Sequence, residues 1–269
     1  MINNNQPQVV MTIAGLDPSA GAGALADIKT ISAFGCYGVA AVTSLTLQNT
    51  QGVFGAYHQS RLVVRGQIEP LFDDFEIAAI KTGMLPTAEI IEEIAEIISA
   101  RAVSRLVVDP VVRSTSGFDL IDEKALSALV RNLFPLASVV TPNVVEAERI
   151  TGIAITDSQS IHRAAEAILA LGPRAVLLKG GDFRSETADD LLVDGEGSMV
   201  VSAKRLGSRN THGTGCALAA ALACLLARGL SLRESVPIAK RYINEAINSA
   251  PGLGRGHGPL NHFPPGFGL

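Results

Sequence analysis

The sequence predicts an α/β fold with a mostly parallel central sheet, and three observations support this prediction. Short apolar runs alternate along the chain with longer segments in which apolar residues recur at helical spacing. Fully apolar runs are typical of parallel strands that helices cover on both faces. The unusual polar motifs each follow such a run, which is where ligands bind in open parallel sheets. We therefore expect the functional site at the carboxyl edge of the sheet.

The first half of the chain shows this alternation clearly. The run Val-Val-Met-Thr-Ile-Ala at 9–14 is apolar and rich in β-branched residues, as in a buried strand. Residues 88–100 carry isoleucine at positions 90, 91, 94, 97 and 98, which form one face of a helix. By the same two criteria, we expect further strands at 39–46, 77–81 and 105–109 and further helices at 22–34, 61–75 and 123–133.

The second half continues the pattern and ends in a loop. Two apolar runs separated by Gly195-Glu-Gly197 predict a hairpin. The tail at 251–269 is rich in glycine and proline, so we expect no regular structure there. The remaining expected elements are strands at 138–141, 175–179, 190–194 and 198–202 and helices at 144–151, 160–171, 213–228 and 232–248.

Composition restricts the class of protein. The 269 residues are 47% hydrophobic with no linker between elements, so we expect a single domain over 1–269, with flexible tails at 1–8 and 264–269. A net charge of −4 and 4% aromatic residues argue against nucleic-acid binding. Three cysteines without metal-like spacing suit a reducing compartment. Because no signal peptide or membrane-spanning run is visible, we expect a cytoplasmic protein.

The most informative motif is Asn-Thr-His-Gly-Thr-Gly-Cys at 210–216, directly before an apolar helix. Glycines at 213 and 215 allow backbone N–H groups to crowd around an anion at the helix N-terminus, where phosphate commonly binds. A helix N-terminus can lower a cysteine pKa to roughly 3.5–7.5, so we expect Cys216 to be a base. The alternatives are a covalent nucleophile activated by His212, or a simple helix cap.

Two motifs near the N-terminus are less specific. Gly21-x-Gly23 matches neither a complete dinucleotide fingerprint nor a Walker loop, and Asp27 at this spacing either compensates a helix dipole or binds a ligand. The carboxamide of Gln48 suits the edge of an aminopyrimidine but also suits a surface turn. Met84 follows a strand and forms either core packing or the apolar floor of a pocket.

Three charged residues follow later strands. Asp109 and Glu146 have the oxygen ligands that Mg²⁺ prefers on a bound nucleotide, although isolated carboxylates at such positions are more often helix-start or surface groups. Lys179 ends a strand before two glycines, where it either reaches a phosphate as a point charge or is solvated in a turn. Together they favour a phosphate-handling site.

Taken in order, these motifs are similar to those of a known family. The chain resembles the hydroxymethylpyrimidine/phosphomethylpyrimidine kinases of thiamin biosynthesis, in the ribokinase superfamily. The resemblance covers nearly the whole chain, from Thr12 to Phe263. It rests on Ala-Gly-x-Asp-x-Ser-x-Gly-Ala-Gly with Ala26-Asp-x-Lys-Thr30, Gln48-Asn-Thr50, Lys81-x-Gly-Met84, Thr141-Pro-Asn143 with Glu146, Lys179-Gly-Gly181, and residues 210–216.

The resemblance implies a ribokinase-like three-layer α/β/α fold and two successive phosphorylations. With ATP and Mg²⁺, such enzymes phosphorylate 4-amino-5-hydroxymethyl-2-methylpyrimidine and then its monophosphate. It further implies a pyrimidine pocket of Gly15, Asp27, Gln48, Met84 and Val111, a phosphoryl site of Gly213, Thr214 and Gly215 with Cys216 as base, ATP contacts from Asn143, Lys179 and Thr211, and metal binding by Asp109 and Glu146.

The sequence also departs from the family pattern. Leu16, Ala20 and Leu47 replace more usual residues, and Arg113-Ser-Thr-Ser-Gly117 lacks the lysine often found before Ser-Gly. Two alternatives stay open, a pyridoxal kinase of the same subfamily and a non-catalytic pyrimidine-binding protein. Because relatives often form dimers, we expect a homodimer that contacts neither membrane nor nucleic acid.

Overall fold

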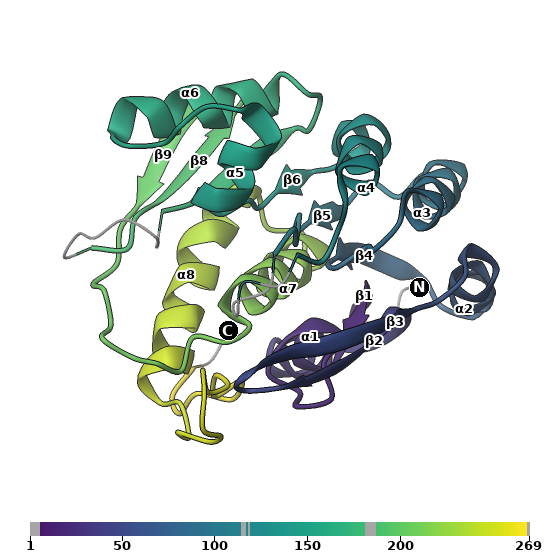
Figure 1. The fold of residues 1–269 in the computed structure, drawn as a ribbon, viewed down its shortest axis with the longest axis horizontal. Coiled ribbons are helices and arrows are strands. Elements are labelled where there is room, and N and C mark those ends of the chain that lie inside the picture. Colours follow the sequence, from purple (N-terminus) through teal and green to yellow (C-terminus); the bar gives the residue numbers. More distant parts are fainter. Residues whose placement is uncertain (1–5, 114–116, 118, 181–186, 268–269) are drawn as a thin grey trace.

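A computed structural model describes residues 6–113, 117, 119–180 and 187–267. They form a nine-stranded sheet with the order β3-β2-β1-β4-β5-β6-β7-β8-β9. The six central strands from β2 to β7 run parallel, whereas β3, β8 and β9 are antiparallel to their neighbours. Figure 1 shows this sheet with helices on both sides, which confirms the predicted three-layer α/β/α architecture.

The elements follow one another largely as predicted. The strands are β1 (Val9–Leu16), β2 (Tyr37–Asn49), β3 (Gly52–His58), β4 (Ile77–Thr82), β5 (Leu106–Val108), β6 (Val139–Val140), β7 (Ala175–Lys179), β8 (Asp190–Asp194) and β9 (Gly197–Val201). The α-helices are α1 (Gly23–Ala33), α2 (Arg61–Asp74), α3 (Ala88–Ala100), α4 (Glu123–Ala128), α5 (Val144–Thr151), α6 (Ser158–Leu169), α7 (Thr214–Ala227) and α8 (Leu232–Asn248).

Two apolar layers hold the helices to the sheet. On one face, α2 to α6 pack against alternate strand residues, and the buried isoleucines of α3 form the centre of this layer. On the other face, α1, α7 and α8 cover the remaining strand side chains. Eleven consecutive residues of α7, from Ala217 to Ala227, are buried. Its many alanines allow α1, α8 and the sheet to approach closely, which places the start of α7 at the sheet edge (Figure 1).

The second strand differs from its prediction. β2 extends to Asn49 and pairs with β3, a strand that the sequence analysis does not predict. Gln48 therefore lies within a hairpin strand, opposite Val53, and not in a surface turn. Leu45, Leu47 and Tyr57 are exposed, and no residue of β3 is buried, so β3 lacks the apolar face of a half-buried strand.

Smaller corrections concern a helix and the tails. The helix predicted over 123–133 ends at Ala128 and continues as a π-helical turn, Leu129–Leu133. The C-terminal tail is packed as far as it is described, because the Phe267 ring contacts Phe34 and Tyr242. Residues 1–5 and 268–269 of the predicted tails lie outside the described residues. In the described chain, no helix has both the length and the apolar character needed to cross a bilayer.

Candidate active site

A cavity of about 590 Å³ opens at the carboxyl edge of the parallel strands. Its lining comes from the ends of β1, β2, β4, β5 and β7 and from the start of α7. The sequence placed its candidate residues at these strand ends, and the structure brings nearly all of them together. Those that line the cavity are Gly15, Gln48, Met84, Asp109, Val111, Asn143, Glu146, Lys179, Thr211, Gly213, Thr214, Gly215 and Cys216.

The start of α7 has the geometry expected of an anion site. Gly213 is the N-cap residue with φ of 82°, a conformation that residues with a side chain rarely adopt. A Cβ at Gly213 would lie 1.9 Å from the carbonyl oxygen of Gly21. At Gly215, a Cβ would lie 3.1 Å from Nζ of Lys179. Both glycines therefore keep the unpaired N–H groups of the first helical turn open to the cavity and close to a cation.

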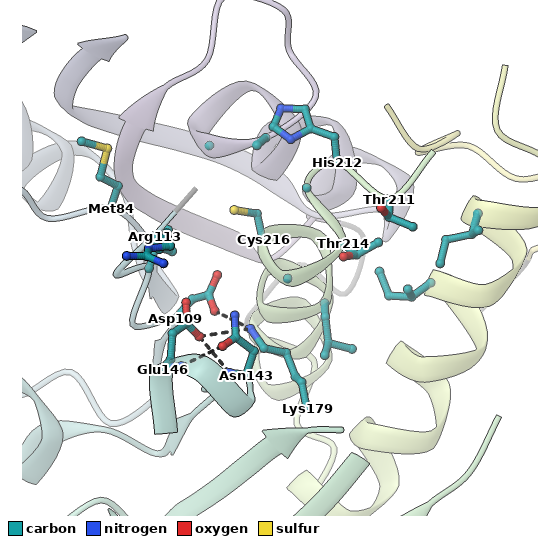
Figure 2. Close-up of a pocket in the computed structure, with 18 of the residues that line it drawn as sticks. Met84, Asp109, Arg113, Asn143, Glu146, Lys179, Thr211, His212, Thr214 and Cys216 are labelled. Atoms are coloured by element: carbon teal, nitrogen blue, oxygen red, sulfur yellow. Dashed lines mark hydrogen bonds and ion pairs between the residues drawn. The ribbon is translucent and has the colours of Figure 1, made fainter. Parts of the chain in front are cut away.

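A cluster of opposite charges lies beside this helix start (Figure 2). Nζ of Lys179 is 3.0 Å from Oδ1 of Asp109 and 3.9 Å from Oε2 of Glu146. Asn143 and Glu146 form the capping box of α5, in which each side chain accepts a hydrogen bond from the other residue's backbone N–H. Burial raises the pKa of Glu146 to about 7, although the ammonium of Lys179 opposes this effect.

The two carboxylates suit Mg²⁺ but would not enclose it. Their oxygens are the ligands that Mg²⁺ prefers, and both approach the same ammonium group. Among the described residues, no group of three or more histidine, cysteine, aspartate or glutamate side chains could hold a metal. This donor set fits an ion that is bound by one or two carboxylates, substrate phosphates and water.

The environment of Cys216 differs from the prediction. It is the third residue of α7 and lies in the cavity wall (Figure 2). Burial raises the pKa of its thiol to about 11, while the ammonium of Lys81 acts in the opposite direction. Loss of hydration therefore opposes the depressed pKa that the helix N-terminus suggests.

Asp27 is not in the cavity wall, contrary to the prediction. Its side chain is fully buried, where Oδ2 accepts hydrogen bonds from Oγ1 of Thr12 at 2.6 Å and from Nζ of Lys81 at 2.7 Å. Burial raises the pKa of Asp27, and the ammonium of Lys81 opposes this effect. Lys81 itself lines the cavity, so this lysine connects Asp27 with the site.

The structure adds polar residues that the sequence analysis did not assign to the site. Asp17 and His212 line the cavity and are paired, with 2.8 Å between Oδ2 and Nε2. Lys204 and Arg205 also line the cavity. Asp17 and His212 could have been assigned from the sequence, because both belong to motifs quoted above. The residues 181, 182 and 114–116 of two other motifs lie outside the described part of the chain.

Comparison with known proteins identifies the family. The phosphomethylpyrimidine kinase family matches residues 17–261. The chain is 45% identical over 258 residues to the hydroxymethylpyrimidine/phosphomethylpyrimidine kinase of Rhizobium meliloti, covering 95% of this chain and 97% of that protein. The chain belongs to the phosphomethylpyrimidine kinase family. Its members are kinases, so the chain is a phosphotransferase.

A second relative is longer than this chain. The thiamine biosynthesis bifunctional protein ThiED of Geobacter sulfurreducens is 47% identical over 254 residues. The match covers 94% of this chain but 52% of that protein, so the chain spans about half of its length.

Solved structures agree with the family and the fold. The phosphomethylpyrimidine kinase of Clostridium difficile superposes with a TM-score of 0.80 at 42% identity, covering 89% of this chain and 99% of that one. An ADP complex of the pyridoxal kinase of Bacillus subtilis gives 0.89 at 33% identity, covering 96% and 98%. The cavity is thus the candidate active site of a ribokinase-like kinase, as the sequence predicts.

Proposed function

We propose that the chain transfers phosphate from ATP to the hydroxymethyl group of 4-amino-5-hydroxymethyl-2-methylpyrimidine and then to the resulting monophosphate, in thiamine biosynthesis. The observation that carries this proposal is the family match over residues 17–261, together with a single cavity that contains the predicted motifs. The ADP complex of the pyridoxal kinase neighbour supports ATP as the donor.

The chain's own groups supply charge and position, which are what phosphoryl transfer requires. The N–H groups at the start of α7 stabilise the phosphoryl group in transit, and Lys179, whose ammonium lies next to Gly215, balances its charge. Asn143 holds Glu146 in place through the capping box, and Asp109 is held by hydrogen bonds from Thr141 and Lys179. Thr211 and Thr214 offer hydroxyl donors to the ATP phosphates at the same helix start.

Asp109 and Glu146 would hold Mg²⁺, directly or through water. The ion, when bound, neutralises charge on the nucleotide phosphates. Because Lys179 contacts both carboxylates in the structure, its ammonium must share them with the ion or turn toward the phosphates. The pKa of Glu146 near 7 means that acidic conditions oppose this binding.

The two phosphorylations make different demands on Cys216. In the first step, the hydroxymethyl oxygen attacks the terminal phosphorus of ATP, the bond from that phosphorus to ADP breaks, and the hydroxyl proton passes to the Cys216 thiolate. In the second step, the attacking group is a phosphate oxygen that already carries charge, so no base is needed. Arg113, which lines the cavity and pairs with Asp119 at 2.9 Å, is positioned to replace the missing family lysine in this second step.

Pyridoxal is the second candidate substrate. It is also a flat ring that bears a hydroxymethyl group, and the pyridoxal kinase of Bacillus subtilis superposes over 96% of this chain. A carboxamide at position 48 favours the aminopyrimidine, because it can donate and accept at once. Gly15, Met84 and Val111 supply the apolar part of the ring pocket.

Incubation with ATP, Mg²⁺ and hydroxymethylpyrimidine tests the proposal. We expect the monophosphate to appear first and the pyrophosphate later, identified by mass. A matched Lys179→Met variant should lose most of both products while retaining the fold. Wild-type enzyme that forms neither product would contradict the proposed function.

We further propose that the chain forms a cytoplasmic homodimer through the β2–β3 hairpin. Leu45 and Tyr57 are cross-strand partners and, with Leu47, expose an apolar face, with exposed fractions of 45%, 66% and 49%. Light scattering tests this, because Leu47→Lys should shift the mass from two chains to one. A wild-type monomer at micromolar concentration would contradict the proposal.

A further inference from the structure

A chain of polar contacts connects the anion site with the ring pocket. Asp17 and His212 come from two different loops and are 2.8 Å apart. The same Nε2 atom of His212 is also 3.1 Å from the amide nitrogen of Gln48 in β2. The amide oxygen of Gln48 is in turn 3.1 Å from Oγ1 of Thr46, which donates to the carbonyl of Leu16 at 2.9 Å.

Asp17 is a fixed, acceptor-only group in this chain. Its Oδ1 accepts from the backbone N–H and the hydroxyl of Ser19, and its Oδ2 accepts from the backbone N–H of Ala22. Burial opposes its ionisation, but the hydrogen bonds from His212 and Ser19 hold the pKa of Asp17 below its ordinary value. The carboxylate therefore stays charged and requires a proton on the nitrogen that faces it.

That requirement constrains Gln48. With its proton directed to Asp17, Nε2 of His212 has no lone pair for an amide N–H. Turning the Gln48 amide by 180° exchanges its nitrogen and oxygen and removes this conflict. The carbonyl then faces the Nε2–H group of His212 as a second acceptor beside Asp17, and the NH₂ group donates to Thr46, whose own proton already goes to Leu16.

We propose that His212, held by Asp17, is a positioning residue that fixes the Gln48 amide with its carbonyl toward the imidazole. This orientation decides which donor and acceptor the amide presents to the substrate ring. It thereby selects the aminopyrimidine over rings that lack the amino group. The inference rests on the proposed function, since it assigns a specificity device to the same pocket.

Gly21 provides independent support for a fixed imidazole. A Cβ at this position would lie 2.4 Å from Cδ2 and 3.2 Å from Nε2 of His212. The backbone of Gly21 does not need a positive φ, so the absent side chain serves to admit the ring. Gly21→Ala therefore displaces His212 without removing any polar group.

The test compares hydroxymethylpyrimidine with its 4-deamino analogue, 5-hydroxymethyl-2-methylpyrimidine, as phosphate acceptors. The readout is the ratio of their kcat/KM values in wild type, His212→Ala, His212→Gln and Gly21→Ala. The glutamine variant retains an N–H that can reach Asp17, and so it tests rescue. Gly66→Ala is the matched glycine control, since a Cβ there would contact nothing within 4 Å. Melting temperatures report folding separately.

We expect His212→Ala and Gly21→Ala to lower the preference for the aminopyrimidine by about tenfold, the effect of losing one oriented hydrogen bond. His212→Gln should restore most of it, and Gly66→Ala should leave it unchanged. An unchanged ratio in both His212→Ala and Gly21→Ala would overturn the inference, even if total activity fell. Failure of wild type to phosphorylate hydroxymethylpyrimidine would instead contradict the proposed function.

Discussion

At the scale of single residues, the surroundings of Cys216 decide its chemistry. The helix N-terminus and Lys81 favour a thiolate, but burial raises the thiol pKa to about 11. A thiol accepts a proton only after ionisation, so at neutral pH only a small fraction of the enzyme carries an active base. The base role consequently predicts a specific pH dependence.

We predict that kcat for the first phosphorylation rises by about tenfold per pH unit below the thiol pKa, whereas the second phosphorylation is nearly independent of Cys216. Cys216→Ala should lower the first rate by about 10²–10⁴ and the second far less. Cys216→Asp should recover part of the first rate and flatten its pH profile, because a carboxylate is ionised at neutral pH. Rate measurements with each acceptor between pH 6 and 10 on the wild type and both variants check this prediction. A substrate covalently bound to Cys216, found by mass spectrometry, would contradict the role of Cys216 as a base.

The residues themselves were largely predictable, but their electrostatics were not. A motif after a strand predicts that Asp109, Lys179 and Gly213 share one edge, because parallel strands end together. The family resemblance implied that Asp27 lines the pocket, whereas the structure buries it behind Lys81. Side-chain burial depends on packing from distant parts of the chain, which sequence spacing does not contain.

At the scale of elements, α7 combines a buried body with an open N-terminus. Two of its glycines have positive φ, Gly213 at the start with 82° and Gly229 after the end with 90°. Only Gly213 has a neighbour that an added Cβ would strike, the carbonyl of Gly21 at 1.9 Å. Substitution of Gly229 therefore tests backbone strain alone, whereas substitution of Gly213 tests backbone strain together with damage to the anion site.

We predict that Gly213→Ala lowers kcat by about 10²–10³, as expected for disturbed oxyanion donors. Gly229→Ala should lose about 1–2 kcal/mol of stability from backbone strain while its kcat stays near wild type. Steady-state kinetics and thermal melts of both variants provide the comparison. Equal kcat losses in the two variants would show that backbone strain, and not damage to the anion site, lowers the activity.

The strand β3, which the sequence analysis does not predict, shows where prediction of single elements from sequence fails. No residue of β3 is buried, so this strand lacks the apolar face that burial imposes. The elements that were predicted closely, such as α3 and β7, are those in which burial dictates the pattern.

At the scale of the whole molecule, the C-terminal segment packs against helices α1 and α8. Nδ1 of His262 is 3.0 Å from Oγ1 of Thr30 in α1, and its carbonyl accepts from the hydroxyl of Tyr242 in α8 at 3.0 Å. Burial and the nearby Lys29 lower the pKa of His262 to about 4. The unfolded chain gains a proton on this histidine near pH 6.5, whereas the folded protein does so only near pH 4.

We therefore predict that His262 lowers the free energy of unfolding as the pH falls from 6.5 to 4, by up to about 3 kcal/mol. His262→Gln should remove this part of the pH dependence, while the exposed His257→Gln should retain it. Urea unfolding at a series of pH values measures the slopes. Parallel curves for wild type and His262→Gln would be inconsistent with a buried neutral histidine.

The central claim is that one cavity performs both phosphorylations of an aminopyrimidine. Its most direct test is phosphate transfer from ATP to hydroxymethylpyrimidine, to its monophosphate and to pyridoxal, measured side by side with one enzyme preparation. We predict the highest kcat/KM values for the two pyrimidines and a much lower value for pyridoxal. A higher value for pyridoxal, or no transfer to the monophosphate, would contradict this account.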